Sequence, residues 1–168
     1  VGSNTIKLLV AELSSLGDLI VQHERSDATR IESEYSTGGH TLTGNGMNEG
    51  LKAIERLIQQ SLPYEPVCLR IVATGLVRDS VNGMLFADRV RAVTGYKLDI
   101  ISGDEEATGI ALGVNTDSFL SNQSNYLVCD LGGGSLELIR VENRTVRATA
   151  SLPLGAVRLA QRFVNNSS

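Results

Sequence analysis

A pattern of ten residues at the start of the chain recurs 130 positions later. Val1–Val10 aligns without a gap on Leu131–Arg140, and each copy is a turn of small residues followed by residues that favour β-strands. Small residues let backbone N–H groups close on an anion, because little side chain stands in the way. Dinucleotide and P-loop fingerprints open a helix, whereas a strand follows here, so each turn should join two strands of a hairpin. The repeat predicts two related lobes whose turns grip phosphates across one cleft.

The second copy has a strand in front of it that the first copy lacks. Tyr126–Asp130 is an apolar run that ends in a carboxylate directly before the turn, whereas nothing precedes Val1. If the repeat extends this far, we expect an aspartate just upstream of Val1. The sequence as given would then start in the middle of a strand.

The order of periodic segments predicts an α/β fold with a mixed sheet. Segments with strand character or helical periodicity are followed by turn residues in the expected places. The expected strands cover 2–13, 17–25, 67–74, 97–102, 125–130, 134–142 and 145–152, the helices 47–62, 79–94, 103–114 and 155–165, and a loop 33–46. The series of elements begins again after residue 118. We therefore expect a first lobe at 1–118, with its first strand cut short, and the start of an incomplete second lobe at 119–168.

Composition excludes several classes of protein. Apolar residues make up 42% of the 168 residues and charged residues 20%, which suits a folded core and not a disordered chain. The formal net charge of −4 and the lack of a basic block argue against a nucleic-acid or membrane binder. No apolar run approaches the roughly 18 residues of a membrane span. Cys68 and Cys129 lie in apolar runs, so we expect buried free thiols and a cytoplasmic protein.

Two carboxylates accompany the second glycine turn. Asp130 ends the strand before Gly132–Gly134, where it can hold a hydrated Mg²⁺ ion or hydrogen-bond the backbone of its own turn. Glu137 lies two residues into the returning strand, and its alternatives are an active-site carboxylate and a solvated strand position. The combination of Asp-Leu-Gly-Gly-Gly-Ser with a following strand favours ligand or metal binding for Asp130.

The segment Ser102–Glu106 opens a helix and carries three consecutive acids. Ser102 and Glu105 have the spacing of a capping box, and Asp104 is favourable at the helix start, so both of these acids have structural explanations. Glu106 has none from its position, and a carboxylate at a lobe junction could deprotonate an attacking water. Arg78 follows a buried strand, where ligands gather in open α/β sheets, and it either contacts phosphate or pairs with Asp79.

Taken together, five motifs resemble the exopolyphosphatase/guanosine pentaphosphate phosphohydrolase (Ppx/GppA) family, which belongs to the superfamily of actin, sugar kinases and heat-shock chaperone ATPases. They are V-G-S-N-T at 1–5, A-T-G-L-V-R-D-S-V-N-G at 73–83, I-S-G-D-E-E-A at 101–107, D-L-G-G-G-S-L-E-L at 130–138 and S-L-P-L-G-A-V-R-L at 151–159. The resemblance runs in order from the first residue to about Leu159. It implies ribonuclease-H-like lobes around a cleft and Mg²⁺-dependent hydrolysis of terminal phosphoanhydrides.

The resemblance also implies roles for individual residues. Glu106 matches the catalytic base, and Asp130 and Glu137 match active-site carboxylates that we assign to the metal. The matching phosphate-binding positions are Ser3, Asn4, Arg78, Gly132, Gly133, Gly134 and Ser135. The implied substrate is inorganic polyphosphate, with guanosine pentaphosphate as the close alternative and a homodimer as one implied assembly. An actin-like nucleotide switch and a sugar kinase are the rival functions, and the I-S-G-D-E-E-A helix start favours hydrolysis over both.

Overall fold

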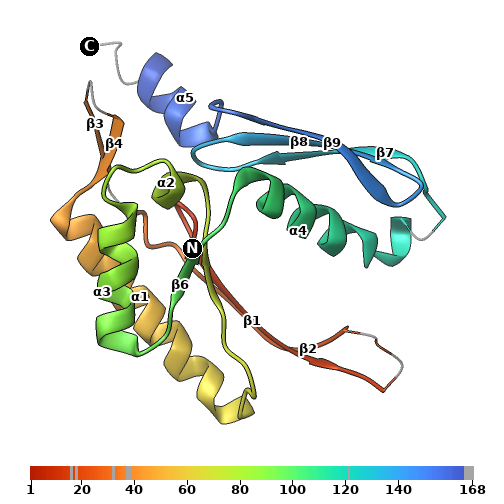
Figure 1. Cartoon of the computed structure of the whole chain (residues 1–168), viewed down its shortest axis with the longest axis horizontal. Coiled ribbons are helices and arrows are strands. Elements are labelled where there is room, and N and C mark those ends of the chain that lie inside the picture. The colour runs from red at the N-terminus through yellow and green to blue at the C-terminus, as the bar shows by residue number, and fades with distance from the viewer. Residues whose placement is uncertain (16, 18, 32, 37–38, 121, 165–168) are drawn as a thin grey trace. The chain divides into compact units, whose positions relative to one another are not determined.

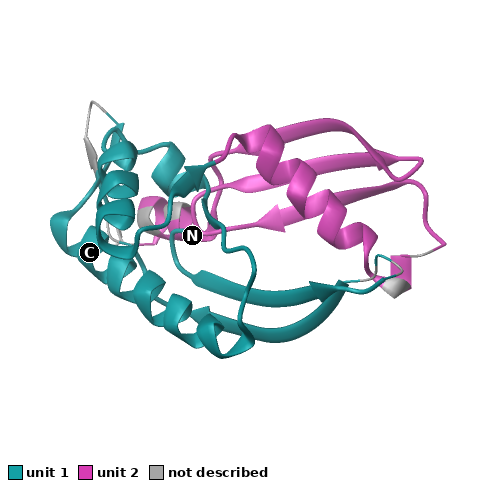
Figure 2. Ribbon diagram, turned by 60° about the horizontal axis from the view of Figure 1, so that its bottom comes forward, with its two compact units in different colours: residues 1–100 teal, residues 101–168 magenta. Residues whose placement is uncertain are grey.

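The computed structural model describes residues 1–168 except 16, 18, 32, 37–38, 121 and 165–168. The chain divides into two compact units, residues 1–100 and residues 101–168 (Figure 2). Its elements follow the order β-β-β-β-α-β-α-α-β-α-β-β-β-α (Figure 1), apart from two short 3-10 helices, η1 at Leu62–Tyr64 and η2 at Ser118–Leu120. This alternation of strands and helices is the α/β pattern that the sequence predicts.

The first unit begins with an antiparallel hairpin. Strand β1 (Ile6–Leu13) pairs with β2 (Leu19–Asp27), and their register shifts by one residue between Val10 and Ala11. Such a shift is a β-bulge, in which one residue of the return strand has no partner and the local twist increases. The two strands lie close to the expected ranges 2–13 and 17–25.

The first unit also contains a parallel pair of strands. Strand β5 (Ile71–Ala73) pairs in parallel with β6 (Leu98–Ile100). Val1 donates through its terminal amine to the carbonyl of Val72, at 2.5 Å, and accepts from the amide of Thr74 at 3.3 Å. These two bonds bracket Ala73 in the manner of a parallel ladder, so the start of the chain continues the β-structure beside β5. Antiparallel and parallel strand pairs thus both occur in unit 1, in separate two-stranded sheets.

Helices of the first unit bury its core. The long helix α1 (Gly44–Ser61) is capped by Thr43, whose Oγ1 accepts from the amide of Gly46 at 2.9 Å. Helix α2 (Gly75–Arg78) is a single turn, and α3 (Gly83–Thr94) ends at Gly95 in the left-handed conformation typical of helix ends. The largest fully buried side chains of the unit are Leu42, Val77, Phe86 and Val90.

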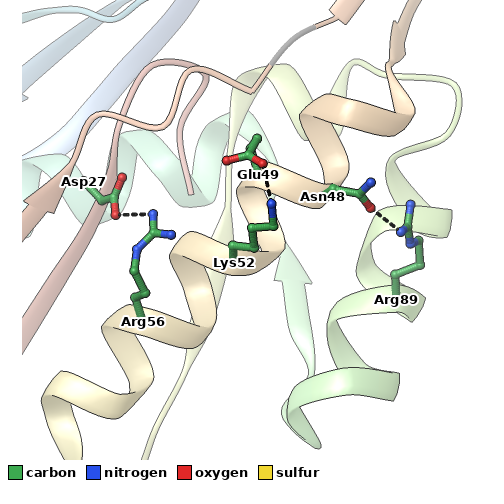
Figure 3. A network of polar contacts seen from close by, with 6 residues as sticks. All are labelled: Asp27, Asn48, Glu49, Lys52, Arg56 and Arg89. Carbon is green, nitrogen blue, oxygen red and sulfur yellow. Dashed lines mark hydrogen bonds and ion pairs between the residues drawn. The ribbon is translucent and has the colours of Figure 1, made fainter.

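Polar contacts on the surface link α1 to its neighbours (Figure 3). Arg56 of α1 donates to Asp27 at the end of β2 at 2.8 Å, and Arg89 of α3 donates to Asn48 at 2.6 Å. Lys52 pairs with Glu49 along α1 itself at 2.8 Å. These contacts orient α1 between β2 and α3, while the apolar core supplies most of the stabilisation.

A short hairpin occupies much of the segment that the sequence analysis assigned to a loop. Strand β3 (Ser33–Ser36) pairs with β4 (Gly39–Leu42). Its Ser- and Gly-rich composition hides the strands, but Leu42 is buried and the Asn82 side chain bonds both backbone groups of Leu42 at 2.9 Å. Asn82 therefore acts as a substitute strand partner. The expectation of a loop was wrong because pairing and one buried leucine outweigh composition.

The second unit is a three-stranded antiparallel sheet with two helices. Its strands are β7 (Tyr126–Leu131), β8 (Leu136–Glu142) and β9 (Thr145–Leu152), in that order across the sheet. Helix α4 (Gly103–Asn115) packs along β8 and β9, and α5 (Ala156–Phe163) follows β9 (Figure 1). All these elements match the expected ranges closely, although residue 165 at the expected end of the last helix lies outside the described residues.

Three expectations need comment. Helix 79–94 begins only at Gly83, because Asp79 instead caps α2. Cys68 and Cys129 are free thiols, but both are exposed, so the expectation that they are buried was wrong. The expected boundary at residue 118 differs from the grouping by contacts, in which α4 belongs with the sheet of unit 2. The assignment of α4 to the first lobe stays a prediction.

Candidate active site

The two glycine-containing turns are built alike. In the first, the amide of Gly2 donates to the carbonyl of Thr5 at 3.1 Å, and in the second the amide of Gly132 donates to that of Ser135 at 2.9 Å. These are aligned positions of the repeat, so the same bond closes a two-residue turn in each copy; the first turn leads into β1, and the second joins β7 to β8. The repeat that the sequence shows is thus also a repeat of backbone geometry.

Backbone bonds from a later segment also anchor each turn. The amide of Ile31 donates to the carbonyl of Ser3, and that of Val157 donates to Gly133, both at 2.9 Å. Ser3 and Gly133 are aligned as well. In both copies, a backbone amide from the segment that follows the hairpin therefore donates a hydrogen bond to a carbonyl of the turn.

The amide groups at the centre of the turns have no acceptor among the described residues. Within the described residues, no hydrogen bond is donated by the backbone amides of Ser3 and Asn4 or of Gly133 and Gly134. These residues are half-buried, and successive unpaired amides of this kind are the donors that an anion-binding turn needs. Helix α5 does not add to them, because its amides of Ala156 and Val157 bond the carbonyls of Gly132 and Gly133.

Gly155 makes the second turn possible. It is buried at the start of α5, and a Cβ built on it would lie 2.2 Å from the carbonyl carbon of Gly134 and 2.3 Å from the oxygen of Gly133. Both contacts are with backbone, which cannot move aside as a flexible side chain can. No other residue type fits between α5 and this turn without displacing it. Sequence analysis did not single out this glycine; its place in the motif at 151–159 was the available signal.

A row of polar residues crosses the sheet of unit 2 beside the turn. The register pairs Asp130 with Glu137, and Glu137 with Ser151. Residues directly opposite one another in neighbouring strands point to the same face with Cβ atoms about 5 Å apart. Glu137 is only 3% exposed, and the hydroxyl of Ser151 donates to its Oε1 at 3.0 Å. The alternative that Glu137 is a solvated strand residue is therefore wrong.

The carboxylates of Asp130 and Glu137 suit a cation. Asp130 is exposed, and its side chain makes no hydrogen bond or ion pair with another described residue, so the alternative that it bonds its own turn is not observed. Burial of a carboxylate with one neutral donor, as for Glu137, is costly unless a cation or ligand adds to it. Mg²⁺ takes one or two carboxylates and completes its shell with water and phosphate. No group of three or more potential ligands occurs in the described part of the chain.

The start of α4 carries the predicted base. Ser102 and Glu105 form the expected capping box, with the Ser102 amide donating to Glu105 Oε2 at 2.8 Å and the Glu105 amide to Ser102 Oγ at 3.2 Å. Asp104 accepts from Thr149 Oγ1 at 2.7 Å, which joins the helix start to β9 two residues before Ser151. Glu106, the next acid, is half-buried in the first turn of α4. Glu106 lies in unit 2, which also contains Asp130, Glu137 and the second turn.

The other predicted residues belong to unit 1. Ser3 and Asn4 form the first turn, and Arg78 ends α2 with its Nε 3.5 Å from Asp79 Oδ1. The ion pair that the sequence analysis held open for Arg78 is thus present, and its phosphate contact stays a prediction. A pocket of about 290 Å³ in the same unit lies among Ile6, Leu8, Ile54, Leu57 and Leu69. Lys7 and Arg70 also line this pocket, and none of the predicted site residues does.

A family model for the Ppx/GppA phosphatase family matches residues 9–168. The chain belongs to this family. It is 33% identical over 163 residues to a protein of Pseudoalteromonas atlantica named guanosine-5'-triphosphate,3'-diphosphate pyrophosphatase. The aligned region covers 96% of this chain and 31% of that protein. The resemblance drawn from the motifs is confirmed. The chain nevertheless spans only about a third of this relative.

Solved structures agree with the family assignment. The Ppx/GppA enzyme of Aquifex aeolicus aligns with a TM-score of 0.79 at 26% identity, over 97% of this chain and 53% of that one. An exopolyphosphatase of Cytophaga hutchinsonii gives a TM-score of 0.86 at 23% identity, over 97% and 51%, which shows a shared fold. The expected α/β fold of the family is therefore confirmed. No helix in the described part is long and apolar enough to cross a membrane.

Proposed function

We propose that this chain supplies part of the active site of a hydrolase that releases terminal orthophosphate from inorganic polyphosphate. The observation that carries the proposal is the pair of equivalent turns, each with backbone amides at its centre that bond no acceptor in the described part of the chain. Such donors bind phosphate oxygens without a net positive charge, which agrees with the acidic composition of the chain.

Each residue has a distinct task in this proposal. The amides of both turns, with Ser3, Asn4, Ser135 and Arg78, hold phosphate groups, and Glu106 accepts a proton from the attacking water. Asp130 and Glu137 would hold Mg²⁺, which supplies charge neutralisation for the transferred phosphoryl group when it is bound. Family membership and the names of the relatives support a phosphoanhydride as the bond that is cleaved.

Guanosine pentaphosphate is a second candidate substrate, favoured by a specific observation. The P. atlantica relative carries the name of a guanosine-5'-triphosphate,3'-diphosphate pyrophosphatase, and so does a Vibrio vulnificus protein that is 38% identical over 109 residues. Both candidates end in the same anhydride, so the same turns and the same base would serve either. The decisive measurement is phosphate release by the full-length protein from long polyphosphate and from guanosine pentaphosphate in parallel.

Substitution of Glu106 tests the base. We expect Glu106→Gln to lower kcat by about 10²–10⁴-fold with little change in KM, because the amide keeps the shape but cannot accept the proton. Glu105→Gln is the matched control, since glutamine also serves in a capping box and turnover should be retained. Turnover of Glu106→Gln near that of the parent would refute the assigned role.

The rival functions give different products. A sugar kinase transfers phosphate to a hydroxyl, and an actin-like switch changes conformation with nucleotide. Phosphate release from polyphosphate that does not depend on added ATP or hexose supports the hydrolase. Activity that requires both ATP and hexose would instead support the kinase.

A further inference from the structure

The buried carboxylate of Glu137 in the candidate site is hydrogen-bonded to a serine hydroxyl. Of the described residues, only Ser151 makes a hydrogen bond with the Glu137 side chain, through Oε1 at 3.0 Å. The backbone register places Glu137 between Asp130 on one neighbouring strand and Ser151 on the other. The contact therefore follows from the pairing of three strands and not from a chance meeting of long surface side chains.

A carboxylate in this position needs its orientation fixed. Glutamate has three rotatable side-chain bonds, and a buried glutamate with no cationic partner has little else to select one rotamer. A hydrogen bond to one carboxylate oxygen sets the plane of the group and leaves the second oxygen, Oε2, to another ligand. Partners of this kind, one step removed from a metal, typically change metal affinity 10–100-fold when they are removed.

We propose that Ser151 is a positioning residue that holds the Glu137 carboxylate in place for the divalent cation of the site. The inference rests on the proposed function, because that proposal gives Glu137 its role toward the metal. Ser151 itself need not touch the cation or the phosphate. Its contribution lies in holding Oε1, so that Oε2 and the neighbouring Asp130 are available together.

The chain offers a matched control on the same strand. Thr149 lies two residues before Ser151 on β9, and alternate residues of a strand share a face. Its hydroxyl donates to Asp104 of α4 at 2.7 Å and not to Glu137. Loss of the Thr149 hydroxyl therefore disturbs the packing of α4 on β9 without removing the partner of Glu137.

Binding of Mn²⁺ alone to the full-length protein tests the proposal. Mn²⁺ is a paramagnetic probe for a Mg²⁺ site, and its dissociation constant can be measured by electron paramagnetic resonance without turnover. Ser151→Thr and Ser151→Val have nearly the same shape and differ mainly in the hydroxyl. We expect Ser151→Val to raise the Kd about 10-fold or more, while Ser151→Thr and Thr149→Val stay within about threefold of the parent.

The outcomes separate this inference from the proposed function. If Glu137→Gln weakens Mn²⁺ binding and Ser151→Val does not, Ser151 has no positioning role. Ser151 is exposed, so in that case a water molecule takes the place of its hydroxyl. If Glu137→Gln also binds Mn²⁺ like the parent, the metal role assigned to Glu137 fails as well. Equal weakening by Ser151→Thr and Ser151→Val would show a steric effect and overturn the inference. Should Ser151→Val not fold, Ser151→Ala removes the hydroxyl with a smaller side chain.

Discussion

The two turn–hairpin segments, residues 1–31 and 131–157, share a backbone but not a chemistry. Both close the turn with the same bond, and both hairpins shift register at aligned positions, between Val10 and Ala11 and between Arg140 and Val141. Their side chains differ: the exposed Lys7 aligns with the buried Glu137. Backbone hydrogen bonds depend little on side-chain identity, so the repeat keeps its turn while only the second copy carries the buried carboxylate.

The copies also bury opposite faces of the equivalent strand. In β1 the core takes Ile6, whereas Leu9 is 56% exposed. In β8 the residue aligned with Leu9 is Ile139, which is fully buried against α4 together with Val141. The comparison shows that a repeated strand does not determine which of its faces receives a helix, because alternate side chains of a strand offer two different faces.

The largest expected effect contrasts these aligned positions. Ile139→Ala should lower the free energy of unfolding by about 3 kcal/mol, because it leaves a cavity beneath α4. Leu9→Ala should cost about 0.5 kcal/mol or less, because its side chain is largely in solvent. Urea unfolding of both variants of the full-length protein measures the difference. Equal losses would show that the face of β1 that bears Leu9 is covered there, and the contrast between the copies would disappear.

A smaller effect tests the contact that only the second copy needs. Gly155→Ala should cost about 2 kcal/mol, because its Cβ would press on the backbone of Gly133 and Gly134. Gly134→Ala is the control, since a Cβ there meets no atom within 4 Å, and it should change stability by about 0.5 kcal/mol or less. Thermal unfolding without substrate gives both values. A Gly155→Ala protein as stable as the control would mean that α5 need not lie so close to the turn.

The smallest effect concerns acid stability of the first copy. The hydrogen bond from Thr29, with help from Arg56, lowers the pKa of Asp27 below its usual value of 3.8. Asp27 pairs with Ile6 at the start of β1, and the residue that pairs with the aligned Leu136 in the second copy is Leu152. An acidic group with a lowered pKa stabilises the folded state above its unfolded pKa, and this contribution is lost as pH falls through the folded pKa.

We therefore expect Asp27→Asn to be less stable than the parent by about 0.5 kcal/mol at neutral pH. The gap should close as the pH falls below about 4. Urea midpoints at pH 7, 5, 4 and 3 measure it, with Leu152→Asn as the counterpart in the second copy. A gap that stays constant down to pH 3 would contradict an electrostatic origin.

Sequence patterns predicted most of the elements, because each has a local cause. The capping box at Ser102 and Glu105 is present, and strands β7, β8 and β9 lie within a few residues of their expected ranges. The hairpin β3–β4 was missed because its stability comes from Leu42 and Asn82, which are 40 residues apart. The contact between Gly155 and the second turn was missed for the same reason. The mutual facing of the two turns stays a prediction, as do the oligomeric state and the aspartate before Val1.

By itself, the sequence determined the duplicated turn, the order of most strands and helices, and the family, because these depend on residue types at short spacings. Only the tertiary structure decided that Glu137 is buried with Ser151 as its partner, and which face of each repeated strand is covered. Both facts depend on the packing of strands and helices that are far apart in the sequence. The pattern of one strand carries no record of the neighbour against which it will pack.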